Sequence, residues 1–210
     1  MRVAGSPPYF SQWESPDLVG AIIRGEVRAE DDPRWRESGA ESRAEYAFWS
    51  WRACGMACLR TVLAARRGTS ATTMGLGKEV LAAGGHRWRP DGLDGLIYAP
   101  FAGYLRERWD IAAEVRADLR IDEVCDLVSR GDWVMASVNP KIRRPADHPE
   151  RRGGHLVLVH GLAGDELVLH NPSGDGEESQ AGARVGKKDF ARFYADRGVV
   201  FPHGEQRLSS

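Results

Sequence analysis

Apolar residues follow a helical spacing through the first two thirds of the chain. Between residues 121 and 128 they stand at positions i, i+3, i+4 and i+7, which predicts an amphipathic helix over 122–130 with Cys125 on its apolar face. The same periodicity predicts helices over 54–67, 73–83 and 97–109. Basic residues fill the last turn of the first of these, and Gly68 follows directly. We therefore expect a buried central helix that ends there.

The first 49 residues are expected to form an N-terminal arm with a helical insertion. Ser15 and Pro16 are typical of the start of a helix. Residues 26–41 are polar and contain helix breakers, which predicts a surface segment with no core element. Ser42, with Glu45 three residues later, has the capping-box pattern that begins a short helix.

The last third of the chain has the apolar runs of a β-sheet. Residues 133–138 predict one strand, HLVLVHGL and DELVLHNP predict a hairpin, and GVVF predicts a short final strand after a helix at KDFARFYA. Helices first and antiparallel strands later favour an α+β fold, in which a central N-terminal helix packs on an antiparallel sheet. We expect residues 50–210 to hold the main domain, and the whole chain to be one compact domain.

Charge and cysteine content restrict the partners and the compartment. The formal net charge of −1 gives no general basic field for nucleic acid or an anionic membrane, so neither partner is expected. No run of about 18 apolar residues and no signal peptide is found. Three cysteines, an odd number, indicate reduced thiols and a cytoplasmic location. Nothing in the sequence indicates an oligomeric state, a cofactor or a metal.

Cys54 is placed at the first turn of the predicted central helix. Unsatisfied amides and the positive end of the helix dipole stabilise a thiolate at such a position. A packed core cysteine is the alternative, and Cys58, one turn later, is more simply a small buried hydrophobe. A catalytic role for Cys54 therefore depends on a partner.

The predicted hairpin supplies that partner. Symmetric pairing about Ala163 would place His155 opposite Asn171, on the same face. The same register pairs Val157 with Leu169 and Val159 with Leu167. The amide oxygen of an asparagine so placed holds one ring nitrogen of the histidine and leaves the other free for a thiolate. A slip of one residue would separate the two side chains.

Three segments together resemble the C39-type cysteine peptidases of the papain-like superfamily. They are CGMACLRTVL, GGHLVLVHG and LHNPSG, and PPYFSQW near the start is similar to the leading segment of that family. The resemblance implies a papain-like fold with Cys54 as nucleophile, His155 as general base and acid, and Asn171 as the orienting residue. It implies cleavage of a peptide or amide bond through a thioester acyl-enzyme on Cys54.

The resemblance also implies an oxyanion hole made by the Cys54 N–H and a glutamine side chain. In the family this glutamine lies shortly before the cysteine, whereas here only Gln12 precedes Cys54, far upstream. We expect residues 13–49 to be an insertion, so that Gln12 folds back to the site. Ser50 is the nearest alternative donor.

Four further residues are candidates for binding the substrate. Trp49 and Trp51 flank the nucleophile and could form the wall of a groove, although at least one is expected in the core. Gly153 and Gly154 would let a substrate backbone approach closely.

Other functions remain open. The same residues would serve an amide-forming acyltransferase or cyclase, and a papain-like domain could also bind a peptide without cutting it. An α/β-hydrolase is excluded, because the chain has no G-x-S-x-G motif. A zinc site at Cys54 and Cys58 is disfavoured, because C-x₃-C within one apolar helix lacks the spacing of such sites.

Overall fold

A computed structural model of the chain describes residues 6–69, 71–90 and 92–204. In these ranges the helices are α1 (Val19–Ile23), α2 (Arg43–Ser50), α3 (Cys54–Arg67), α4 (Thr73–Ala82), α5 (Tyr98–Trp109), α6 (Ile121–Ser129) and α7 (Lys187–Phe193). The strands are β1 (Trp88–Arg89), β2 (Gly92–Leu93), β3 (Glu114–Arg116), β4 (Trp133–Val138), β5 (His155–Ala163), β6 (Glu166–His170), β7 (Ala183–Gly186) and β8 (Tyr194–Phe201). Short 3₁₀ turns lie at Pro16–Leu18, Ala29–Asp31, Trp35–Ser38, Pro140–Arg143 and Glu177–Ser179.

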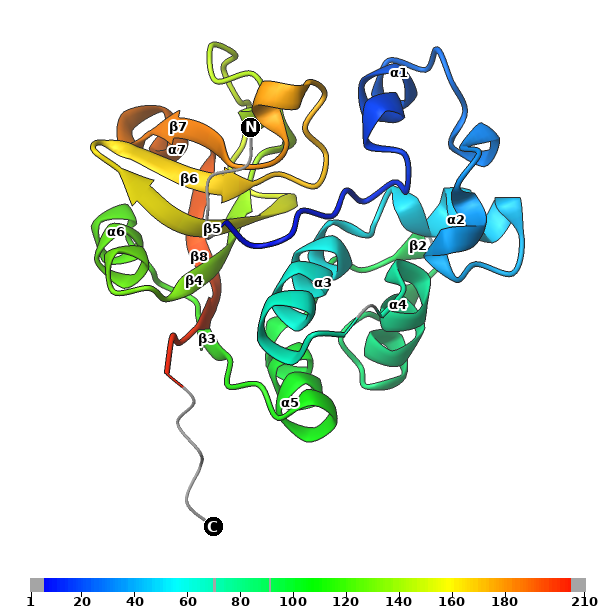
Figure 1. Cartoon of the computed structure of the whole chain (residues 1–210), viewed down its shortest axis with the longest axis horizontal. Helices are drawn as coiled ribbons and strands as arrows, with labels where there is room; N and C mark the ends of the chain where they lie inside the picture. Colours follow the sequence, from blue (N-terminus) through cyan, green and yellow to red (C-terminus); the bar gives the residue numbers. More distant parts are fainter. Residues whose placement is uncertain (1–5, 70, 91, 205–210) are drawn as a thin grey trace.

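Six strands form one antiparallel sheet in the order β3-β8-β4-β5-β6-β7, and β1 pairs with β2 in a separate ribbon. Figure 1 shows the sheet with α6 and α7 in one half of the molecule and α1 to α5 in the other. The predicted α+β class, with an N-terminal central helix packed on an antiparallel sheet, is confirmed. Strands β1, β2, β3 and β7 were not predicted.

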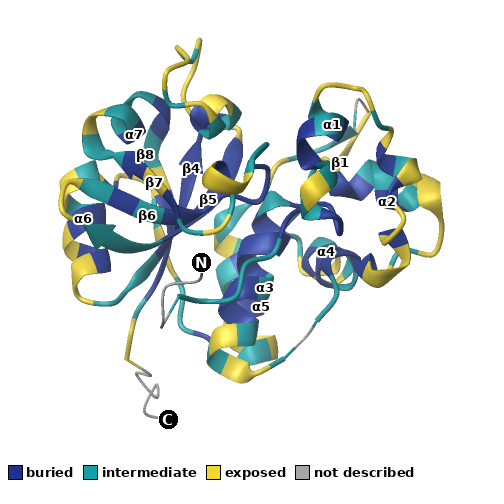
Figure 2. Cartoon of the chain, turned by 45° about the horizontal axis from the view of Figure 1, so that its top comes forward, coloured by how far each residue is buried: buried dark blue, intermediate teal, exposed yellow. Residues whose placement is uncertain are grey.

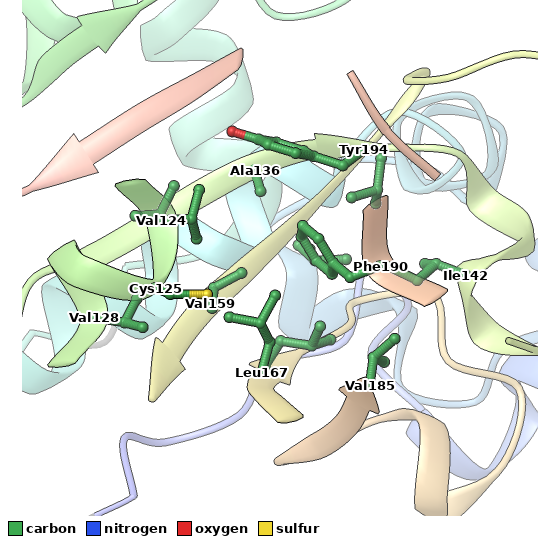
Figure 3. Close-up of a cluster of buried hydrophobic side chains, with 14 of the residues drawn as sticks. Val124, Cys125, Val128, Ala136, Ile142, Val159, Leu167, Val185, Phe190 and Tyr194 are labelled. Atoms are coloured by element: carbon green, nitrogen blue, oxygen red, sulfur yellow. The ribbon is translucent and has the colours of Figure 1, made fainter. Parts of the chain in front are cut away.

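Successive side chains along a strand point to opposite faces of the sheet, and a separate hydrophobic core lies on each face. Val134, Ala136 and Val138 of β4 pack in one cluster with residues of α6 and α7 (Figure 3). Met135, on the opposite face, packs with α3 and α5. Cys125 belongs to the first cluster and Cys58 to the second, so both are buried, as predicted.

Helix α3 is the central helix that the sequence predicts, and it ends before Gly68. Figure 2 shows that it is mostly buried. A Cβ atom on Gly55 would lie 3.1 Å from the side chains of both Leu156 and Leu96. The glycine therefore lets the first turn of α3 approach the start of β5, which brings Cys54 close to His155 in the fold.

Residues 26–41 are mostly exposed and form only short 3₁₀ turns, as their polarity predicts, but the expectation that none of them reaches the core is wrong. Ala29 and Trp35 are buried in a third cluster, which also includes residues of α2. Asp32 is fully buried, and its carboxylate accepts hydrogen bonds from the Ser15 hydroxyl at 2.6 Å and from the Tyr46 hydroxyl. A buried carboxylate requires such partners, so the charged segment is anchored in the protein.

The two helix starts predicted in the arm differ in outcome. Ser15 makes no cap, because its side chain is bonded to Asp32, and α1 begins later, after a 3₁₀ turn. Ser42 does cap α2, accepting the amide of Glu45 at 3.1 Å. In an ordinary capping box the Glu45 carboxylate accepts from the amide of the N-cap residue, which here is Ser42. In this structure it accepts from the amide of Glu41, one residue earlier.

The β5–β6 hairpin does not have the predicted register. Its turn lies at Gly164 and Asp165, so that Ala163 pairs with Glu166 instead of standing at the centre. The three pairs predicted around Ala163 are therefore wrong. A β-bulge at His160 then shifts the register, and the pairs beyond it are Val159 with Leu169 and Leu158 with His170.

The bulge decides which side chains share a face. The register set by the turn alone would place His155 and Asn171 on opposite faces of the sheet. The extra residue at His160 moves one strand by one position. The two side chains consequently lie on the same face, as predicted, although the pairing that was expected to place them there is different.

No helix within residues 6–69, 71–90 and 92–204 has both the length and the hydropathy required to cross a membrane.

Candidate active site

Cys54 and His155 line the same cavity, which has a volume of about 250 Å³. The cavity lies where the first turn of α3 and the segment before α5 meet the end of the sheet at which β5 begins. Its lining also includes Trp51, His86, Asp94, Tyr98, Gly154 and Arg197. The structure therefore brings together the two residues that the sequence predicts to react.

The His155 side chain is oriented by residues that follow β6. Its Nε2 lies 2.9 Å from Oδ1 of Asn171 and 3.0 Å from Oγ of Ser173. Since an amide oxygen accepts only, Nε2 carries a proton in the contact with Asn171. Nδ1 is then the ring nitrogen available to the cavity. Extending the register beyond the bulge places Ser173 opposite His155, which explains why both residues contact one nitrogen.

A second hydrogen-bonded layer lies behind this pair. The Ser173 amide donates to Asn171 Oδ1 at 3.1 Å, and Arg143 donates from Nη2 to the Ser173 hydroxyl at 3.1 Å. Asn171 is almost fully buried and its carbonyl oxygen accepts from the Tyr9 hydroxyl at 2.9 Å. The orienting residue is thus held by its side chain and its backbone.

Burial controls the protonation of both reactive groups. Desolvation raises the pKa of the Cys54 thiol, although hydrogen bonds from the backbone of Leu156 and Gly55 act in the opposite direction. Desolvation lowers the pKa of His155 to about 4, against the hydrogen bond to Asn171, and the charge of Arg143 lowers it further. The resting site therefore holds a neutral thiol and a neutral imidazole. The thiolate expected at the start of the helix is not favoured, because burial outweighs the helix terminus.

Gln12 lies beside the segment that precedes Cys54. Its side-chain amide donates from Nε2 to the carbonyl oxygen of Ser50 at 3.0 Å, and its backbone amide donates to the carbonyl oxygen of Pro172 at 3.0 Å. The side chain is buried, and Oε1 has no hydrogen-bond partner among the described residues. The Ser50 hydroxyl, the alternative donor, donates to the carbonyl oxygen of Ala47 at 3.2 Å.

The four candidate substrate-binding residues lie in different surroundings. Trp51 is exposed and lines the cavity together with Gly154. Trp49 is buried in the third core cluster, where its ring packs against Gly77. Gly153 is buried beside Ser137 and Arg197.

Several residues at the site were not identified from the sequence. His86, Tyr98 and Arg197 line the cavity, and Ser173 and Arg143 support His155. Ser173 lies in the LHNPSG segment, so its nearness to Asn171 was visible, but its contact with His155 depends on the bulge. The other residues come from separate elements and form no local motif.

The comparisons with known proteins give structural matches. No family model matches the chain, and neither does any curated protein. A protein described as a C39-like peptidase from Bacillus anthracis matches with a TM-score of 0.52 and 16% identity, over 73% of this chain and 90% of that chain. The peptidase domain of Streptococcus ComA, a bifunctional ABC transporter involved in a quorum-sensing pathway, matches with a TM-score of 0.48 and 14% identity, over 73% and 93%.

At these identities the likeness concerns the fold. The chain has the papain-like fold of C39-like peptidases, and the resemblance that the sequence predicts is confirmed at this level.

Proposed function

We propose that the protein is a cysteine peptidase that hydrolyses a peptide or amide bond through a thioester on Cys54. The observation that carries the proposal is the shared cavity of Cys54 and His155, in which Asn171 holds Nε2 of the imidazole. The C39-like fold supports it.

In the acylation step, Nδ1 of His155 takes the proton of the Cys54 thiol as the sulfur attacks the substrate carbonyl carbon. The carbonyl oxygen becomes an oxyanion. The imidazolium, with Nε2–H held by Asn171 and Ser173, then gives the proton on Nδ1 to the leaving nitrogen. The C–N bond breaks, the amine departs, and the acyl group remains on sulfur as a thioester.

In the deacylation step, His155 takes a proton from a water molecule as its oxygen attacks the thioester carbonyl. The C–S bond breaks, the acid is released, and the proton returns to the sulfur of Cys54. If an amine attacks instead of water, the same residues form an amide, so the acyl acceptor separates a peptidase from an acyltransferase or cyclase.

Gln12 is our candidate for the second donor to the oxyanion, with the backbone N–H of Cys54 as the first. One N–H of its amide is used by the carbonyl of Ser50, and the second is available for the oxyanion. The Ser50 hydroxyl is a weaker candidate, because it is bonded within its own helix.

The test is incubation of the protein with a mixed peptide library, followed by mass spectrometry of the products, with Cys54→Ala as the matched control. Hydrolysis that depends on Cys54, together with a trapped acyl-enzyme of the expected mass, supports the peptidase. Joined or cyclised peptides would indicate an acyltransferase. Peptide binding without any turnover or covalent intermediate would indicate a binding module.

We also propose a cytoplasmic location. The support is that Cys54, Cys58 and Cys125 are all free thiols. Non-reducing mass analysis of the protein from its native cells would test it, and a disulfide at any of the three would contradict it.

A further inference from the structure

An irregularity in β8 lies next to the candidate active site. Between the pairs Ala136–Gly198 and Val138–Tyr194, β4 has one residue, Ser137, where β8 has the segment 195–197. Asp196, in that segment, has a φ of 50°, which is uncommon for a residue other than glycine. Bulges of this kind redirect side chains and are frequent beside active sites.

The bulge places Arg197 on the cavity that holds Cys54 and His155. Its guanidinium lies over Gly153: a Cβ atom there would be 3.3 Å from Nη2 of Arg197 and 3.1 Å from Oγ of Ser137. Gly153 also has a φ of 80°, so both its conformation and its lack of a side chain are required. The guanidinium is thus accommodated close to the start of β5, where His155 lies.

The charge of Arg197 is not balanced by any carboxylate in the part of the chain that the structure describes. Asp196 pairs with Arg152 at 2.9 Å. Among the described residues that line the cavity, Asp94 supplies the carboxylate. It pairs with Arg89 at 2.9 Å.

The phenol of Tyr98 contacts Arg197, but burial raises its pKa, so it remains neutral. Arg197 is exposed and carries the positive charge of its guanidinium. The cavity therefore presents an uncompensated positive charge beside the nucleophile.

We propose that Arg197 binds a carboxylate of the substrate while Cys54 attacks a nearby carbonyl. The substrate would be an acidic peptide, and the carboxylate belongs either to an Asp or Glu side chain or to a free C-terminus. The planar guanidinium matches a carboxylate, and the hydroxyls of Tyr98 and Ser137 on the same lining can add neutral donors. This inference rests on the proposed function, whose site it shares.

The test uses three thiol reagents of nearly equal size on the full chain. N-iodoacetyl-glutamine amide is uncharged, N-iodoacetyl-glutamine carries an α-carboxylate, and N-iodoacetyl-glutamate α-amide carries a side-chain carboxylate. The rate of Cys54 alkylation is measured by peptide mass mapping. We expect one charged reagent to react about tenfold faster than the uncharged one at low salt, and the faster of the two identifies the source of the carboxylate.

Variants separate Arg197 from general charge effects. In Arg197→Gln the ratio of the charged to the uncharged reagent's rate, measured on the same variant, should fall to about one, and Arg197→Lys should keep part of the advantage. Arg130→Gln, at the C-terminal end of α6 and outside the lining of the cavity, makes the same change in net charge and should keep the full advantage.

Equal rates in the wild type, or an advantage that survives in Arg197→Gln, would overturn the carboxylate site and leave the proposed peptidase standing. No alkylation of Cys54 by any of the three reagents in the folded protein would overturn both.

Discussion

The hydroxyl of Ser173 lies 3.0 Å from Nε2 of His155, the ring nitrogen that also contacts Asn171. In the proposed mechanism His155 accepts a proton, and Nε2–H then has two oxygen acceptors instead of one. Arg143 donates to the same hydroxyl and so fixes its position. The histidine is oriented by a pair of residues, of which only Asn171 was expected from the sequence.

Ser173→Ala should lower kcat by about tenfold with little change in KM, because it removes one acceptor of the imidazolium. Asn171→Ala should have the larger effect. The two changes should not be additive in the double variant, because both act on one nitrogen. Steady-state kinetics of the three variants would check this, and strictly additive effects would show that Ser173 acts elsewhere.

Cys54→Ala should abolish turnover and leave the melting temperature nearly unchanged, because it removes the nucleophile and little packing. Cys125→Ser is the matched comparison. It should keep activity and lose about 1–2 kcal/mol of unfolding free energy, because it places a hydroxyl in an apolar cluster. Peptide hydrolysis and thermal unfolding would be measured for both. Activity in Cys54→Ala would reject the mechanism.

Gln12→Ala should reduce kcat by about 10²–10³ with little effect on KM, because the oxyanion exists only in the transition state. Gln12→Glu keeps the size of the side chain and removes the donor, so its loss should be similar. Alkylation of Cys54 by iodoacetamide should persist in both variants, which shows that the site is still assembled. Unchanged turnover would assign the second donor to another residue.

Acid should destabilise the folded protein through His155. Its pKa is lowered to about 4 in the folded state, against about 6.5 in an unfolded chain. Between these values the unfolded chain binds a proton that the folded chain does not, so stability is complete above about pH 6.5 and falls as the pH decreases towards 4. The loss is on the order of 3 kcal/mol when complete.

Urea unfolding at several pH values would measure this loss. His155→Gln should lose less stability than the wild type over the same range. His160, whose pKa burial lowers to about 3, acts in the same direction and remains in the variant. An identical pH dependence in both proteins would contradict the assignment to His155.

Elements with a strong local pattern could be predicted from the sequence. The helix over 54–67 and the strand over 133–138 have the bounds expected, because their periodicity and end signals agree. The burial of Ala29, Asp32 and Trp35 within residues 26–41 was missed because the many charges of this segment dominate its pattern. The burial of Asp32 depends on Ser15 and Tyr46, which are distant in sequence.

The site could be predicted in part, since Cys54, His155 and Asn171 carry a recognisable pattern. The prediction that His155 and Asn171 share a face is correct, although the register behind it is wrong. The actual turn moves one of the two side chains to the opposite face, and the bulge at His160 moves it back, so the two changes cancel. A single bulge leaves no mark in the pattern of apolar residues. The position of Arg197 at the cavity depends on a second bulge, in β8. It was missed because that bulge also leaves no mark in the pattern of apolar residues.

The arm that carries Gln12 runs alongside the residues that follow β6. The carbonyl oxygen of Pro7 lies 2.9 Å from Nε2 of His170. The Tyr9 hydroxyl donates to the carbonyl oxygen of Asn171, which is 162 positions later in the sequence. The backbone amide of Gln12 donates to the carbonyl oxygen of Pro172. During synthesis the arm leaves the ribosome first, and its partners follow only after roughly ten to thirty seconds of elongation. A nascent chain therefore cannot complete the candidate site, in which Gln12 and Asn171 both take part, until β6 and the residues after it have emerged.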